Sequence, residues 1–101
     1  MKIAVLAHIR HAIAEPFSGG MEAHCDALCR GLRAAGHEVD LFAAEGSHDP
    51  GLVPICAAPY DDVLPWRIYR GTRELAAYQR DAFEQVLMRI GPGGYDVVHN
   101  N

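Results

Sequence analysis

Two glycines stand where a polar loop runs into a helical pattern, and this stretch has the residue types for binding an anion. Ser18, Gly19 and Gly20 come directly before an amphipathic segment that closes on Gly36. Glycines let a ligand approach the backbone, and the free amides and dipole at a helix start favour phosphate. A turn that needs glycine for backbone reasons explains the pair equally well, because two glycines make a weak motif. Both interpretations remain open.

Ionisable side chains gather in the loop before these glycines, HIRHAIAEPFSGG. Arg10 can form a two-pronged contact with a phosphate or carboxylate, and we name Arg10, His11 and Glu15 as candidate substrate contacts. A polar loop exposed to water is the competing interpretation for each of them. His8 and His11 lie three residues apart with no acid or thiol at ligand spacing, so we predict no metal site here.

His99 stands at the carboxyl end of the last apolar run, residues 96–99. Ligands of open α/β sheets bind beyond the carboxyl ends of the strands. His99 is therefore a candidate catalytic residue, acting as a general base or a substrate contact. A histidine with a purely structural role at the bottom of a cleft is an equal alternative.

The elements that must position these side chains follow from the apolar patterns. Short apolar runs predict four strands, at residues 2–7, 37–43, 52–56 and 96–99. Helical periodicity predicts two helices, within residues 18–36 and at residues 72–90. The second has one apolar face, expected to be buried, formed by Leu75, Ala82, Phe83, Val86 and Ile90. Residues 57–68 have no clear period, which indicates a loop or a short irregular segment. Crossovers between parallel strands are right-handed, and the proline at position 54 favours an edge position for the third strand. Together these rules predict a parallel sheet of order 3-2-1-4 in a three-layer Rossmann-like α/β domain.

The first helix has a predicted apolar stripe and a predicted solvent side. The stripe consists of Met21, Cys25, Leu28, Leu32 and Ala35. Glu22, Asp26, Arg30 and Arg33 are expected on the opposite side, with Asp26 and Arg30 able to pair. Ser18 is the expected cap of this helix. Cys25 is expected to be a small buried thiol rather than a metal ligand.

Size and composition limit the class of protein. The chain has 101 residues, so it is one domain at most, and 9 basic against 13 acidic residues give 9 − 13 = −4. This charge argues against a general affinity for nucleic acid or for an anionic membrane. No signal peptide or membrane-spanning run is visible. An odd count of three cysteines is typical of reduced thiols, which favours the cytoplasm.

Taken together, these segments resemble the amino-terminal domain of a GT-B glycosyltransferase of family 4. The resemblance lies in MKIAVLA, then SGGMEAHCDALCRGLRAAGHEVDLFA, and finally YDVVHNN. The set GG-x-E, GL-x-x-x-GHEV-x-LFA and DVVH is fairly specific. Residues 50–80 contribute little to this resemblance.

The resemblance implies an enzyme of two Rossmann-like domains that transfers a sugar from a nucleotide-sugar donor with retention of configuration. It implies that this domain binds mainly the acceptor, while Gly19 and Gly20 close over the donor's diphosphate. The nucleotide sugar is a co-substrate, and no cofactor or metal is implied. Many members place an important histidine shortly after the strand that matches Asp96–His99, so that role falls to His99 or to a later residue.

Residues 1–101 are accordingly expected to form an incomplete amino-terminal domain whose carboxyl-terminal, donor-binding domain is absent. Such a fragment is expected to be inactive alone and to self-associate, and any peripheral membrane association belongs to the full-length enzyme. The alternative is a stand-alone flavodoxin-like or nucleotide-binding module with a binding or regulatory role. Against a response regulator, the first predicted strand ends in Ala7-His8 where acidic residues are needed.

Overall fold

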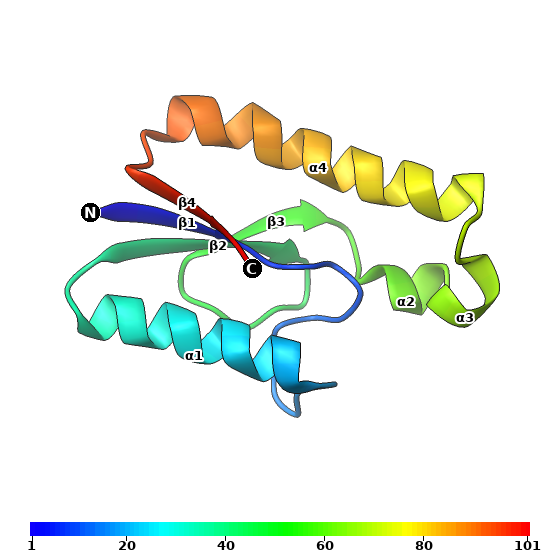
Figure 1. The fold of residues 1–101 in the computed structure, drawn as a ribbon, viewed down its shortest axis with the longest axis horizontal. Coiled ribbons are helices and arrows are strands. Elements are labelled where there is room, and N and C mark those ends of the chain that lie inside the picture. The colour runs from blue at the N-terminus through cyan, green and yellow to red at the C-terminus, as the bar shows by residue number, and fades with distance from the viewer.

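The computed structural model describes residues 1–101 and contains four strands and four helices (Figure 1). The strands are β1 (Lys2–Leu6), β2 (Glu38–Ala44), β3 (Leu52–Cys56) and β4 (Val97–Asn100). The helices are α1 (Gly20–Ala34), α2 (Tyr60–Val63), α3 (Trp66–Tyr69) and α4 (Arg73–Gly93). All four predicted strands and both predicted helices are present, with ends that shift by up to three residues.

The strands form one parallel sheet in the order β3-β2-β1-β4, which confirms the predicted topology. Ile3 of β1 pairs with Val39 of β2 on one side and with Val97 of β4 on the other. Pro54 lies on the edge strand β3, next to a register shift between Ala43 and Ala44. A proline cannot donate to a ladder, so an edge and an irregularity are where it is tolerated.

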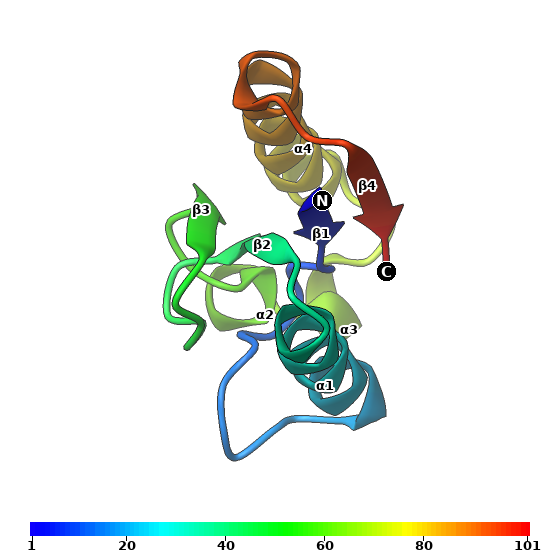
Figure 2. The same cartoon turned by 90° about the vertical axis from the view of Figure 1, so that its left-hand side faces the viewer.

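Helices cover both faces of the sheet, with α1 on one side and α4 on the other (Figure 2). Successive side chains of a strand point to opposite faces, so each strand contributes to both cores. Ile3 and Val5 pack in the core under α1, which also contains Cys25 and Cys29. Ala4, the residue between them, packs in the core under α4. The three-layer arrangement predicted from the sequence is thus confirmed.

The first turn of α1 differs from the prediction. Glu22, expected in solvent, is only 3% exposed, whereas Met21, expected in the apolar stripe, is 58% exposed. The turn lies against the polar loop after β1 rather than over the apolar sheet, so it encloses an acid that faces His8. Further along the helix Cys25 is fully buried and Arg30 donates to Asp26 across 2.8 Å, as predicted. Ala35, predicted in the stripe, is exposed where the helix ends, and Arg33, predicted in solvent, is partly buried because it binds Asp49.

The segment expected to be irregular forms the two short helices α2 and α3. Each follows a proline, Pro59 or Pro65, with φ of −55° and −49°. Proline fixes φ near the helical value, so it leads the chain into a helical turn where periodicity over four residues is too short to be detected.

Helix α4 begins where predicted and extends further than predicted. Thr72 caps it by accepting a hydrogen bond from the Leu75 N–H at 3.3 Å. The helix continues through Pro92 and ends at Gly94, whose φ of 68° is left-handed. Phe83, expected on its buried face, is exposed, because it lies beside an open pocket instead of a covering element.

Candidate functional site

A polar pocket of about 390 Å³ lies where the loop after β1 meets the start of α1. Its lining comprises His8, Arg10, His11, Ser18, Gly19, Gly20, Met21, Glu22 and Tyr60. The carboxyl ends of the parallel strands point to this end of the molecule, which is where open α/β sheets bind ligands (Figure 1). Five of the residues proposed from the sequence as site residues therefore share one cavity.

The start of α1 presents free backbone donors to this pocket. Gly19 is the N-terminal cap, not Ser18 as predicted, and no side chain caps the helix. The first intrahelical bond runs from the Ala23 N–H to the Gly19 carbonyl, at 3.3 Å. The amides before Ala23 lack an intrahelical partner, and a Cβ placed on Gly20 would meet nothing within 4 Å. Space and donors for an anion are both present.

Glu22 and His8 form a contact that the sequence analysis missed. The Glu22 side chain is 4% exposed, and its Oε2 lies 3.5 Å from His8 Nε2. That ring nitrogen is buried and makes no hydrogen bond. The other, Nδ1, accepts from the Arg10 N–H at 3.3 Å. The proton of a neutral His8 therefore resides on Nε2, facing the carboxylate.

Arg10 is held at the rim of the pocket by α2 and α3. Its Nε lies 3.5 Å from Asp61 Oδ1, and its guanidinium carbon lies 5.1 Å from the centre of the Trp66 ring. The pKa of Asp61 is lowered, mainly by a hydrogen bond from the Trp66 N–H and further by the charge of Arg10. Arg10 Nε itself is buried without a hydrogen-bond partner. The two short helices thus fix a cation beside the glycines.

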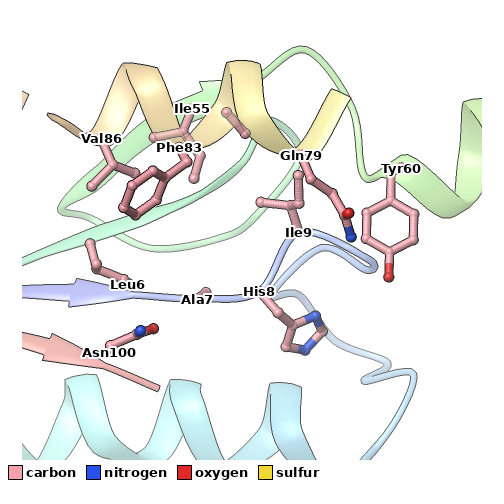
Figure 3. A pocket seen from close by; sticks show the side chains of 11 residues that line it. Leu6, Ala7, His8, Ile9, Ile55, Tyr60, Gln79, Phe83, Val86 and Asn100 are labelled. Carbon is pink, nitrogen blue, oxygen red and sulfur yellow. The ribbon is translucent and has the colours of Figure 1, made fainter. Parts of the chain in front are cut away.

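An apolar pocket of about 260 Å³ adjoins the polar one on the α4 side of the sheet. Leu6, Ile9, Phe83 and Val86 contribute to its wall, and Asn100 of β4 closes one side. Figure 3 shows the His8 ring extending from the end of β1 toward α1, whereas Phe83 reaches the pocket from α4. His8 and Tyr60 line both pockets, and burial raises the pKa of Tyr60.

Two of the predicted site residues lie apart from this arrangement. Glu15 is exposed and lines a separate pocket of about 200 Å³, together with Asp26, Arg30 and His48. His99 lies on β4, paired in register with Val5, and its side chain is exposed. Their proposed roles stay predictions. The sequence analysis noted both Glu22, the acid of GG-x-E, and His8, which follows β1 by two residues, but it did not predict that they lie in contact.

No group of three or more histidine, cysteine, aspartate or glutamate side chains lies close enough to hold a metal ion. None of the helices combines the length and apolarity that crossing a bilayer requires.

The parallel sheet and its flanking helices define a Rossmann-like α/β domain, and a polar pocket lies at its carboxyl edge beside the glycine-led start of α1. A family model described as Glycosyltransferase Family 4 matches residues 18–101, so the chain belongs to this family. The match begins at Ser18, the first residue of the glycine segment, and includes His99. A search of curated proteins found no significant match.

Proposed function

We propose that these residues form the acceptor-side domain of a retaining glycosyltransferase that uses a nucleotide-sugar donor. The observation that carries this proposal is the polar pocket, where Gly19 and Gly20 lie together with Arg10 and His11 at the carboxyl edge of the sheet. The family match supports a transferase role. Donor recognition by a second, carboxyl-terminal domain completes the proposal.

The diphosphate of the donor would lie against the start of α1. In glycosyl transfer the bond from the anomeric carbon to the diphosphate oxygen breaks, a bond to the acceptor oxygen forms, and the proton of the acceptor hydroxyl passes to the departing diphosphate. Negative charge then accumulates on the departing diphosphate, and fixed backbone amides at a helix start stabilise such charge without reorganising. Arg10, fixed by Asp61 and Trp66, supplies a cation at the rim. No metal is needed in this proposal.

The acceptor would enter the adjoining apolar pocket. Its wall is formed mainly by aliphatic and aromatic side chains from β1 and α4, with few polar groups to fix orientation. Apolar pockets with a small number of convergent polar groups are typical small-molecule sites. His8 and Tyr60, which line both pockets, lie where donor and acceptor would meet. His99 remains a candidate for a catalytic role from β4.

A binding experiment on the 101-residue chain tests the diphosphate site. Nucleoside diphosphates and the matching nucleosides are titrated into isotope-labelled protein, and backbone amide shifts are followed by NMR. We expect Gly19, Gly20 and Met21 to shift with the diphosphates and to remain in place with the nucleosides. Shifts confined to other residues, or equal shifts with both ligands, would contradict the proposal.

A matched pair of glycine variants sharpens the same experiment. Gly20→Ala puts a methyl group where the phosphate would approach, yet that methyl meets nothing within 4 Å in the free protein. Binding of nucleoside diphosphate should weaken by about tenfold or more, on the scale of a lost charge-assisted hydrogen bond. Gly31→Ala, also in α1 and equally free of close neighbours, should leave binding unchanged.

A further inference from the structure

We propose that the anion site at the start of α1 takes up a proton together with its anion, and that His8 receives this proton. The inference rests on the proposed function, because it concerns the protonation state in which that site accepts a diphosphate. It assigns a positioning role to His8 and Glu22, neither of which the family match by itself distinguishes.

A buried carboxylate stands in the way of anion binding. Glu22 lies in the first turn of α1 and lines the same pocket as Gly19 and Gly20. Its Oε2 is 3.6 Å from the position that a Cβ on Gly19 would occupy. A diphosphate at the free amides would thus come close to a carboxylate that water hardly reaches. Like charges repel strongly where water is excluded, so the free protein opposes the anion that its backbone attracts.

His8 is placed to remove this opposition. It is the basic side chain within 4.0 Å of Glu22, and its buried Nε2 faces the carboxylate. Neutral His8 leaves the charge of Glu22 uncompensated. A proton added at Nδ1 makes the ring a cation, and the pair with Glu22 then carries no net charge.

The same proton frees a backbone donor. In the neutral ring Nδ1 accepts the hydrogen bond from the Arg10 N–H. Once Nδ1 carries a proton, it can no longer accept, so the Arg10 amide and the Nδ1–H are both released as donors. Two N–H groups next to a helix start are suited to phosphate oxygens. Protonation therefore removes a repulsion and adds two donors at one pocket.

The other charged groups around the pocket do not replace His8 in this role. Arg10 and His11 belong to the same loop and line the same pocket, but neither forms an ion pair with Glu22. Asp61 of α2 offsets part of the Arg10 charge at 3.5 Å, and Tyr60 of α2 is a neutral phenol. On α1 itself, Glu22 is the titratable group that lines the pocket.

The direction of the pH dependence follows from linkage. An anion that prefers protonated His8 binds more tightly at low pH, and the bound anion raises the pH at which His8 loses its proton. One linked proton limits the change in affinity to about tenfold per pH unit. Histidines titrate between about pH 5 and 8, so affinity should fall by about tenfold or more between about pH 6 and pH 8.

Inorganic sulfate is the probe, because its charge is constant over this range. Sulfate is titrated into the 101-residue chain at several pH values, and its affinity is read from backbone amide shifts. Long-range nitrogen–proton NMR spectra report the protonation of each histidine ring in the same samples. We expect the His8 ring to gain a proton as sulfate binds. Sulfate affinity independent of pH would overturn the linkage and leave the anion site standing, whereas no sulfate binding at any pH would overturn both.

Two variants should change the affinity in opposite directions. Glu22→Gln removes the repulsion, so binding at about pH 8 should tighten by about tenfold, to near the wild-type affinity at about pH 6. His8→Gln cannot take up a proton, so binding at about pH 6 should weaken by about tenfold to near the wild-type affinity at about pH 8. Glu74→Gln, an exposed acid in the first turn of α4, is the matched control and should behave like wild type.

A third variant separates the two histidines of the loop. His11→Gln should weaken sulfate binding at low pH but leave the uptake of a proton by His8 in place. The assignment to His8 would be overturned if the sulfate affinity of His8→Gln kept its full pH dependence while that of His11→Gln lost it. If His8→Gln fails to fold, the ring spectra of the wild-type protein still decide, because they identify the histidine that is protonated on binding.

Discussion

Two arginines of α1, Arg30 and Arg33, form ion pairs with aspartates, and water reaches the two pairs to different extents. Arg33 holds Asp49 with both guanidinium nitrogens, at 2.9 and 2.5 Å, and also donates to the Val39 carbonyl at 2.8 Å. The Asp49 side chain is 3% exposed. Arg30 meets Asp26 at 2.8 Å, but the Arg30 side chain is 72% exposed. The two ion pairs consist of the same groups, but we expect the buried pair to contribute more to the free energy of unfolding.

Removing the charge of Asp49 should be the costlier change. Asp49→Asn leaves the Arg33 guanidinium without its buried partner, and we expect the free energy of unfolding to fall by about 3 kcal/mol, the lower end for a buried pair because Arg33 is partly exposed. Asp26→Asn on the exposed pair should cost only about 0.3–0.5 kcal/mol. Urea unfolding followed by circular dichroism measures both. Equal losses in the two variants would show that burial is not what distinguishes the pairs.

At this scale the sequence predicted part of the lining of the candidate site. Arg10, His11, Ser18, Gly19 and Gly20 were chosen for residue type and proximity along the chain, and the structure brings these five into one pocket. Glu22 was assigned to solvent because the helical pattern gives no sign that the first turn faces a loop instead of the sheet. Such contacts depend on how a loop folds back, which periodicity does not encode.

Among the elements, the turn between β2 and β3 depends on a glycine that has no room for a side chain. A Cβ on Gly51 would lie 2.3 Å from the Val39 carbonyl oxygen and 2.8 Å from Arg33 Nη2. The Gly51 N–H also donates to Asp49 Oδ1 at 2.8 Å. The turn, the start of β2 and the buried ion pair therefore occupy one tightly filled region.

Gly51→Ala should destabilise the protein, because the methyl group can be accommodated only by moving backbone or breaking the contact of Arg33. We expect a loss of about 1–3 kcal/mol, as for other overpacked sites. Gly31→Ala, at an open position in α1, should instead stabilise by up to about 1 kcal/mol through helix propensity. Thermal unfolding of the two variants side by side gives the sign of each. If Gly51→Ala left the stability unchanged, the turn would be able to adjust its backbone more easily than its contacts indicate.

The regular elements were predictable because each has a strong local cause. Pro54 directed β3 to the edge, and the right-handed crossover rule then left few strand orders. Helices α2 and α3 were not predicted, because a helix of four residues is too short to show a hydrophobic periodicity. The prolines that precede them, Pro59 and Pro65, are their only sequence signal. The burial of Phe83 was predicted wrongly because its position on the helix says nothing about an open pocket beside it.

For the molecule as a whole, transfer requires donor and acceptor in one cleft. Residues 1–101 form one sheet with a polar and an apolar pocket, and in the proposed function a second domain binds the nucleotide and sugar. Catalysis of this kind depends on holding both reactants in a productive geometry. We therefore expect residues 1–101 alone to transfer no sugar from any nucleotide sugar.

Release of nucleoside diphosphate from a panel of nucleotide sugars measures this. The isolated chain should give only the background rate, and the chain joined to its proposed donor-binding domain should give turnover. Gly20→Ala in the joined protein is the control that ties turnover to the pocket at α1. Turnover by the isolated chain, free of contaminating enzyme, would disprove the expectation.

The open edge of the sheet is the last feature that acts at the scale of the whole molecule. Strand β4 pairs with β1 on one side only, and its residues Val97 and Val98 are 40% and 46% exposed. Leu87 and Met88 of α4 add further exposed apolar surface. An unpaired, apolar strand edge is a template for pairing with another chain.

We propose that two copies of the 101-residue chain associate through β4, which would join their sheets into one. Sedimentation at tens of micromolar detects association of roughly micromolar affinity. Val98→Lys should give a monomer with unchanged secondary structure, because a charge on the edge blocks pairing while β4 keeps its bonds to β1. Fraying of residues 95–101 is the competing outcome, since terminal segments with few contacts are lost easily, and amide exchange would reveal it. A monomeric wild-type chain with β4 protected from exchange would contradict the proposal, because an ordered edge would then persist without a partner.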